Sequence, residues 1–367
     1  MPVVDRPGLA SSTKVAGPLA KNMVWRAAFR RWPSGIAQDL TPGYTLLMPV
    51  PGDMPVFVRL ALATVAAQER GARAEILVIP DGPSAGMAEA VAACAAETGL
   101  RDVRMVKLSP LSRTLGRAAR SDPATNYFLQ LHAGVSETAT THALLHDADL
   151  FLTDAGFLAR HHRRCADRGL ACLGVSPAWD DWLREHGLAH VVATWEMIFD
   201  VHWMRWFPPW RHRSHHAWID GQWHGFDVTL CAQAKTAPDL CDLHPRADDS
   251  FVHFNWVIGG YRKFQGNEGR PVEDARFNLL LIRLMIDALD RRLVGVSRAT
   301  ISVPSADELA RGLTDPSRRV TYCHDARAAE YGPFRAKIRR LYEAPLFDDA
   351  AVEVIEERLS PFDAALL

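Results

Sequence analysis

Short apolar runs alternate with segments of helical periodicity over the first half of the chain. Runs bounded by Gly, Pro or Asp predict buried strands at 44–50, 74–82, 103–109, within 142–152, and at 170–177. Apolar residues at helical spacing predict helices at 55–71, 84–99, 123–139 and 154–169, the last with Asp154 as N-cap. Continuous apolar strands that alternate with helices are typical of a parallel sheet covered on both faces. We therefore expect an α/β fold.

The alternation fails from 178 to 226, where the chain is aromatic, basic and interrupted by proline. Beyond it, the pattern predicts the start of a helix at 226–235, a strand-like run at 250–265 and a largely buried helix at 275–292. The expected division is an N-terminal extension (1–40, with a short helix near 24–31), a catalytic domain (41–270, with halves 41–150 and 151–270) and a mainly helical C-terminal region (271–367).

Composition and charge limit the kinds of function that this chain could have. The 367 residues carry 42 Lys and Arg against 43 Asp and Glu, and this balance argues against nucleic acid as a partner. Six cysteines without a CxxC motif are typical of reduced thiols. The chain shows neither an apolar leader nor a window long and apolar enough to span a bilayer, so we expect a cytoplasmic protein, with peripheral membrane contact as an open alternative.

The strongest chemical signal is HALLHDADLF at 142–151, in which Asp147 and Asp149 follow an expected strand. Alternate residues of an extended segment point the same way, so the two carboxylates could share one Mg²⁺ or Mn²⁺ ion. The alternative is a solvated turn. Ligands of such sheets bind beyond the carboxyl ends of the strands, and two other strand ends carry Pro49 and Asp81.

These segments resemble glycosyltransferases of the GT-A fold, which use nucleotide-sugar donors. YTLLMPVPGD, FVRLALATVAAQ and AEILVIPDGPS resemble the family's opening strand, helix and second strand, and NYFLQLHAGVSETATTHALLHDADLFL resembles its segment that ends in Asp-x-Asp. The resemblance covers roughly residues 44 to 265. It implies a GT-A-type nucleotide-binding sheet with helices on both faces, followed by the C-terminal helical region.

The resemblance also implies roles for individual residues. Asp81 would contact the donor's base or ribose beside Pro49, Asp149 would be the main metal ligand, and Asp147 would lie near the ribose or the metal. His253 matches the late histidine that completes the metal site in many members; a core histidine is the alternative.

Further along the chain, Arg262 and Lys263 follow a Gly-Gly pair and would neutralise the departing diphosphate. Asp227 stands where inverting members carry the base that deprotonates the acceptor, although an aspartate at a helix start is also a common N-cap. Glu196 and Asp220 are weaker candidates for this base.

The Trp- and His-rich segment allows several interpretations. Aromatic rings stack on sugars, so Trp203, Trp206 and Trp223, together with Trp210 and Trp218, could line an acceptor site. A packed aromatic subdomain and a membrane-surface segment are the alternatives. The histidines of this segment raise a zinc hypothesis, but their spacing matches no common zinc finger; they are His212, His215, His216 and His224.

The leading hypothesis is a Mn²⁺- or Mg²⁺-dependent glycosyltransferase of polysaccharide biosynthesis. It would transfer a hexose from a UDP- or GDP-sugar to a hydroxyl of a glycan, a lipid-linked sugar or a small metabolite. Whether the reaction inverts or retains the anomeric configuration stays open. The alternatives are a sugar-1-phosphate nucleotidyltransferase, which should have a Gly-rich basic loop where this chain reads PVPGDMPVF, and a non-catalytic carbohydrate-binding protein.

Overall fold

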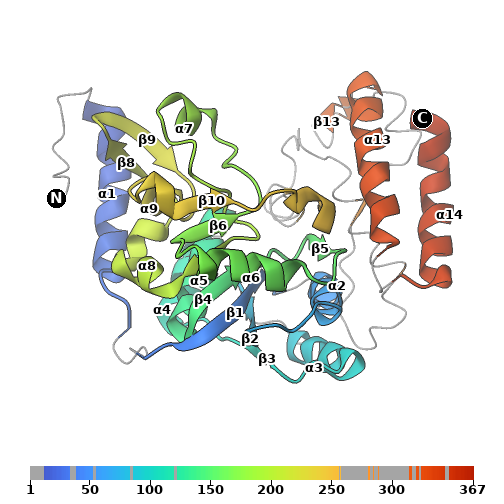
Figure 1. Ribbon diagram of the computed structural model, residues 1–367. Coiled ribbons are helices and arrows are strands. Elements are labelled where there is room, and N and C mark those ends of the chain that lie inside the picture. The colour runs from blue at the N-terminus through green and yellow to red at the C-terminus, as the bar shows by residue number, and fades with distance from the viewer. Residues whose placement is uncertain are drawn as a thin grey trace.

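A seven-stranded mixed sheet forms the centre of the protein (Figure 1). The computed structural model describes residues 12–33, 39–52, 55–82, 86–119, 122–255, 257, 280–281, 284, 288, 314–315, 320–321, 324–343 and 347–367. The strands of the sheet are β1 (Thr41–Val50), β2 (Arg73–Pro80), β3 (Val103–Met105), β4 (Thr140–Leu145), β6 (Cys172–Gly174), β7 (Ile198–Asp200) and β10 (Cys241–Leu243).

The strand order is β10-β6-β7-β4-β1-β2-β3. All neighbours are parallel except β7, which is antiparallel to both β4 and β6. The expectation of a wholly parallel sheet is therefore wrong at this strand. The physical reason is the connection from β6 to β7, which contains the short helix α7 (Asp181–Glu185) and no long crossover helix.

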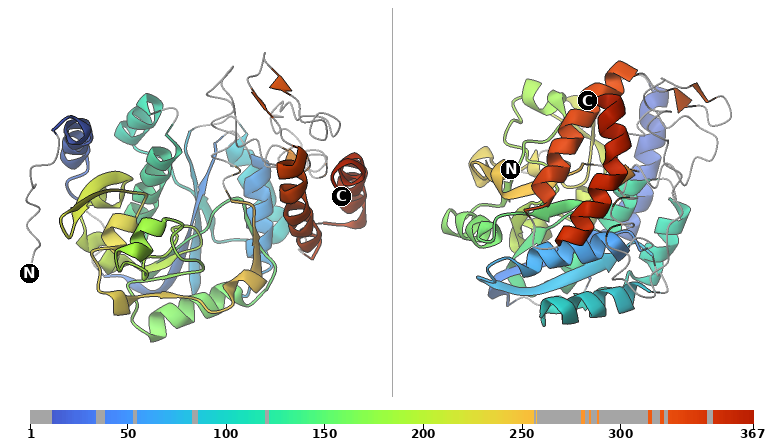
Figure 2. Two further views of the ribbon diagram at one scale, coloured as in Figure 1. Left: turned by 90° about the horizontal axis from the view of Figure 1, so that it is seen from above. Right: turned by 90° about the vertical axis from the view of Figure 1, so that its right-hand side faces the viewer.

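Helices cover both faces of the sheet, as expected for the α/β class. They are α1 (Ser12–Ala28), α2 (Pro55–Ala66), α3 (Met87–Thr98), α4 (Pro110–Ala118), α5 (Pro123–Glu137), α6 (Phe157–Asp167), α8 (Val201–Trp206), α9 (Leu230–Gln233), α13 (His324–Leu341) and α14 (Asp349–Leu366). One apolar core joins α2, α3 and α6 to one face, and a second joins α1, α5 and α8 to the other. Figure 2 shows α1 and the C-terminal pair α13 and α14 on opposite sides of the sheet.

Period-two alternation in the central strand explains the two cores. Leu46 and Met48 belong to the core beneath α2, whereas Leu47 belongs to the core beneath α5. All three side chains are fully buried. Gly134 lets α5 lie close to β1 and β2, because a Cβ at Gly134 would be 3.1 Å from Leu47 Cδ2 on β1 and 2.6 Å from Ile79 Cδ1 on β2.

Smaller elements complete the described part of the chain. They are the antiparallel pairs β5 (Leu150–Leu152) with β11 (Phe251–His253), β8 (His215–Ile219) with β9 (Gln222–Phe226), and β12 (Thr314–Asp315) with β13 (Val320–Thr321), and the 3-10 turns η1 (Pro209–His212), η2 (Pro238–Leu240) and η3 (Ala247–Ser250). The hairpin of β8 and β9 lies beside α1 (Figure 1).

Several local predictions need correction. The helix expected near 24–31 is the second half of α1, whose Trp25 and Phe29 are buried in the core under α5. Asp154 is not the N-cap of α6, because Gly156 occupies that position; Asp154 instead accepts a hydrogen bond from the Gly156 N–H at 3.0 Å. Helix α4 and the β8–β9 hairpin were not predicted.

The described part of the C-terminal region is mainly helical, with the short β12–β13 pair as the exception. Arg335 on α13 pairs with Glu356 and Asp363 on α14, which fixes the two helices against each other. Within the predicted helix 275–292, only Leu280, Leu281, Leu284 and Ala288 are described; they are helical and buried. No described helix is long and apolar enough to cross a bilayer. The proposed domain boundaries stay a prediction.

Packing at the central strand leads to a stability prediction. Leu47→Ala should lower the free energy of unfolding by about 2–5 kcal/mol, because it leaves a cavity between β1 and α5. The matched control Leu111→Ala, at a side chain that is 49% exposed on α4, should change it by about 0.5 kcal/mol or less. Denaturant titration measures both. Equal losses in the two variants would contradict this packing.

Candidate metal and donor-binding site

The candidate site lies where strand order reverses. The chain builds β1, β2 and β3 outward in one direction and then places β4 on the other side of β1. Crevices at such points, beyond the carboxyl ends of the strands, are where α/β sheets bind ligands. The turn that holds Asp147 and Asp149 directly follows β4, so the structure places the sequence-predicted pair at this edge.

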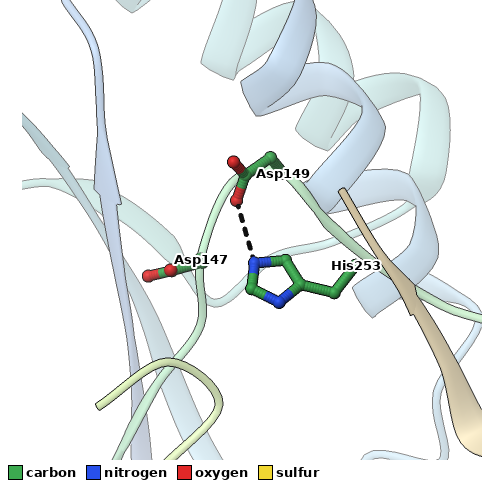
Figure 3. Close-up of side chains that lie close together, drawn as sticks. All are labelled: Asp147, Asp149 and His253. Carbon is green, nitrogen blue, oxygen red and sulfur yellow. Dashed lines mark ion pairs between the residues drawn. The ribbon is translucent and has the colours of Figure 1, made fainter. Parts of the chain in front are cut away.

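Asp147, Asp149 and His253 converge in space (Figure 3). Each offers one ligand atom, and these atoms lie within 4.8 Å of one another. His253 Nε2 is 3.4 Å from Asp149 Oδ1. The β5–β11 ladder causes this approach, because it pairs His253 with Leu150, the residue that follows Asp149.

The charges of this group call for a cation. Burial and the neighbouring Asp149 charge raise the pKa of Asp147 to about 6. Burial also acts to raise the pKa of Asp149, but the hydrogen bond and charge of His253 outweigh it and lower that pKa. Two carboxylates and an imidazole in this arrangement fit Mn²⁺ or Mg²⁺, with Mn²⁺ favoured by the nitrogen ligand. The residues present therefore fit the divalent ion that the family resemblance implies.

Two further groups hold the carboxylates. The Tyr127 hydroxyl on α5 donates to Asp147 Oδ1 at 2.9 Å, and the Val257 N–H donates to Asp149 Oδ2 at 3.1 Å. Burial, followed by the charge of Asp147, raises the pKa of Tyr127 well above its usual value; Asp227 and Asp149 act on it in the same direction. Tyr127 thus stays a neutral donor and lies within the field of all three acids.

A strained turn supports the other side of the group. Glu196 is fully buried at a φ of 49°, a backbone conformation that L-residues rarely adopt. Its Oε2 lies 2.7 Å from Nδ1 of His146, the buried residue before Asp147. The preceding Trp195 packs its ring 4.3 Å from that of His253. The turn at Trp195 and Glu196 therefore contacts two residues of the site: His146, which precedes Asp147, and His253 itself.

Helix α13 connects the C-terminal region to the site. The Lys337 ammonium donates to the His253 carbonyl at 2.7 Å, and Arg340 donates to the Phe251 carbonyl at 2.9 Å. Burial lowers the pKa of Lys337, while the charge of Asp149 acts to raise it. The C-terminal region thus braces β11 and adds a cation near Asp149.

Asp81 lies at the same edge, at the end of β2. Its Oδ1 accepts a hydrogen bond from Gly52 N at 2.8 Å, so it bridges the segments that follow β1 and β2. The two segments approach closely here, because a Cβ at Gly52 would lie 2.0 Å from the Gly82 carbonyl oxygen. Pro49 pairs with Ile79 one step before this edge. Donor contacts of Pro49 and Asp81 stay predictions.

Two predicted cations lie outside the described residues: Arg262 and Lys263. Asp227, in contrast, lies between β9 and α9, and burial raises its pKa. Thr229, and not Asp227, is the N-cap of α9. Within the described residues, Asp227 Oδ1 accepts a hydrogen bond only from the adjacent Val228 N–H. The charge of Asp227 also acts to raise the pKa of Tyr127, the residue that donates to Asp147.

The predicted acceptor tryptophans are dispersed. Trp203 is 6% exposed in the core and donates from Nε1 to Thr236; Trp206 is 82% exposed; Trp223 is half-buried on β9, stacked on His216. Trp210 is buried and Trp218 half-buried. Their role in acceptor binding stays a prediction.

The histidines of this segment form no zinc cluster within the described residues, where Asp147, Asp149 and His253 make the one group that could hold a metal. Instead they have separate partners. His212 bonds the Met204 carbonyl, His215 the Arg213 carbonyl and His224 the Asp180 carboxylate.

The pKa of Asp147 leads to a pH prediction for the metal site. A metal ligand must be deprotonated, so the apparent Mn²⁺ affinity should fall as pH drops through about 6. Between pH 7 and pH 5, we expect a loss of about tenfold from Asp147 alone. Calorimetric titration with Mn²⁺ measures it, and Asp147→Asn should flatten that part of the profile. An affinity that is the same at both pH values would contradict Asp147 as a ligand.

Comparisons with known proteins give matches among solved structures. No protein-family model and no curated protein matches the chain. A mannosyltransferase from Pyrobaculum calidifontis in complex with GDP-mannose and Mn²⁺ is 16% identical, with 94% of this chain and 97% of that chain covered and a TM-score of 0.41. A galactosyltransferase in complex with donor and acceptor sugar analogs is 11% identical, with 85% and 99% covered and a TM-score of 0.41. Glucosyl-3-phosphoglycerate synthase from Mycobacterium tuberculosis is 10% identical, with 81% and 89% covered and a TM-score of 0.37.

The solved structures that this chain resembles are thus glycosyltransferases, the class that the sequence resemblance named. With TM-scores of 0.41 and below, this likeness carries no argument about the reaction of this chain.

Proposed function

We propose that this protein is a metal-dependent glycosyltransferase that transfers a hexose from a nucleotide-diphosphate sugar to an acceptor hydroxyl. The observation that carries the proposal is the convergence of Asp147, Asp149 and His253 at the switch point of the sheet. A group of two acids and an imidazole at that position suits a divalent ion whose remaining positions are filled by phosphate oxygens.

Asp147, Asp149 and His253 would hold Mn²⁺ or Mg²⁺ in this proposal. The bound ion would supply electrostatic stabilisation to the leaving diphosphate. The chain's own groups orient the ligands: Tyr127 fixes Asp147, and the Val257 N–H fixes Asp149. Asp81, which accepts a hydrogen bond from Gly52 N–H across the segments after β1 and β2, would contact the base or ribose of a UDP- or GDP-sugar.

Asp227 is our candidate for the general base. Burial raises its pKa above the usual value of an aspartate, the direction that suits a base, and its carboxylate is not used as a helix cap. In the reaction, the acceptor oxygen forms a bond to the anomeric carbon while the bond from that carbon to the diphosphate oxygen breaks. The hydroxyl proton passes to Asp227, and the nucleoside diphosphate leaves. This assignment applies to an inverting reaction.

The acceptor in this proposal is a glycan, a lipid-linked sugar or a small metabolite. A peripheral contact with a membrane is supported by Trp206, which is 82% exposed, and by Met23 on α1, which is 70% exposed. Exposed tryptophan and apolar helix residues favour membrane interfaces.

Binding of the donor nucleotide tests the proposal directly. One of UDP, GDP, dTDP and CDP should raise the melting temperature by a few °C when Mn²⁺ is present, because a ligand at a hundred times its Kd stabilises the native state by about 2.7 kcal/mol. Asp149→Asn should abolish the shift. The control Asp181→Asn, at a carboxylate that is 74% exposed, should keep it. If no nucleotide shifts the wild type with either metal, the donor site is refuted.

Replacement of the candidate base separates binding from chemistry. Asp227→Asn should reduce the rate of nucleoside diphosphate release in the presence of acceptor by about 10²–10⁴-fold, while Mn²⁺ and nucleotide binding stay unchanged. Asp181→Asn is the control, because its carboxylate is 74% exposed and was not a candidate for the base. Full turnover in Asp227→Asn would show that Asp227 is not the base.

A further inference from the structure

A cavity of about 570 Å³ lies next to Asp227, and the N-terminal helix forms one of its walls. The size is typical of small-molecule sites. Its lining comes from α1, the residue before α5, and the β8–β9 hairpin with its flanks; the polar side chains are Lys21, Asn22, Asp122, Arg213, Ser214, His215, His216 and Asp227. None of the tryptophans considered for the acceptor lines it.

Arg213 is the unusual residue of this cavity. It is 2% exposed, and it forms no ion pair with any carboxylate in the described part of the chain. Its Nε has no hydrogen-bond partner there. A buried guanidinium normally has an anionic partner, because burial of an unpaired charge is costly.

Helix α1 holds this cation in place. Asn22 is buried, accepts from Arg213 at 3.1 Å, and donates to the His216 carbonyl at 2.9 Å. The Arg213 guanidinium lies 4.7 Å from the centre of the Trp25 ring. These contacts come from neutral groups, so they orient the guanidinium without neutralising it.

Neither acid that lines the cavity, Asp122 or Asp227, forms an ion pair with Arg213. Asp122 caps α5 through the Thr125 N–H and hydroxyl, and Lys21 lies 3.8 Å from it at the exposed side. Burial lowers the pKa of Arg213 to about 10, with Asp122 acting to raise it, and the same Asp122 charge raises the pKa of Asp227. Asp122 therefore influences both groups, while Arg213 and Asp227 remain unpaired with each other.

We propose that this cavity binds the acceptor and that the acceptor is a small hydroxyl compound with an anionic group, a carboxylate or a phosphate. The anion would pair with Arg213, with Lys21 at the exposed side, and a hydroxyl would reach Asp227. A guanidinium offers paired N–H donors in the geometry that such anions accept. The role as acceptor site rests on the proposed function; the selectivity for an anion rests on Arg213 and Lys21 and is independent of that function.

A matched set of hexose derivatives tests the selectivity. Glucose, glucuronate and glucose 6-phosphate share the pyranose ring and differ mainly in the group at C6, and calorimetry against the wild type should give at least tenfold tighter binding for one of the two anions than for glucose. Arg213→Gln should weaken anion binding at least tenfold, and the exposed Lys21→Gln about threefold. Arg213→Lys should restore part of the loss. Retained Mn²⁺ binding shows that each variant is folded.

Equal binding of glucose and both anions, or unchanged anion binding in folded Arg213→Gln, would overturn the proposal. A second experiment compares binding of the protein to vesicles of phosphatidylglycerol and to vesicles of phosphatidylcholine. Arg213-dependent binding to the anionic vesicles alone would assign the anion to a lipid headgroup, whereas binding of the soluble anions assigns it to a free metabolite.

Asp149→Asn distinguishes failure of this proposal from failure of the proposed function. That variant should lose the nucleotide shift but bind the anion as the wild type does. A wild type that binds the anion but no nucleotide would refute the glycosyltransferase and leave the anion site standing.

Discussion

The repulsion between the carboxylates of Asp147 and Asp149 is the constraint on which the rest of the site depends. Two acids on one short turn, largely buried, destabilise each other; burial is the larger cause of the raised pKa of Asp147, and the charge of Asp149 adds to it. A bound divalent ion would relieve this repulsion. Tyr127, the Val257 N–H and His253 each contribute a group that favours the arrangement, and they come from helix α5, the chain beyond β11, and β11 itself.

Short elements achieve this positioning. Strands β5 and β11 have three residues each, yet their register brings His253 beside Asp149. The positive φ of Glu196 lets two successive side chains contact His146 and His253. Helix α13 then donates Lys337 to the backbone of β11. The C-terminal region is therefore a brace for the metal-ligand group as well as a pair of packed helices.

Helix α1 supports the cavity next to Asp227 much as helix α13 supports the metal-ligand group. Trp25 and Phe29 anchor α1 in the core, and Asn22 orients a buried guanidinium from the hairpin segment. The cavity so formed has an unpaired cation and, separately, an acid of raised pKa. Tyr127 is linked to both proposed sites: burial and the charge of Asp147 raise its pKa, and Asp227 acts in the same direction.

The sequence by itself determined the features that are local. Apolar runs specify β1, β2 and β4 because a buried strand needs continuous apolar residues, and Asp147 with Asp149 stand out because their spacing on one turn is visible in the chain. Tyr127 sits in an ordinary helical pattern, and nothing local marks it as the partner of Asp147. His253 was a candidate only through family resemblance, and the β5–β11 register decides its place. Strand β7 runs antiparallel because of its connection, and Arg213 matters because it is buried without a counterion. Such properties arise between segments distant in sequence, so only the tertiary structure decides them.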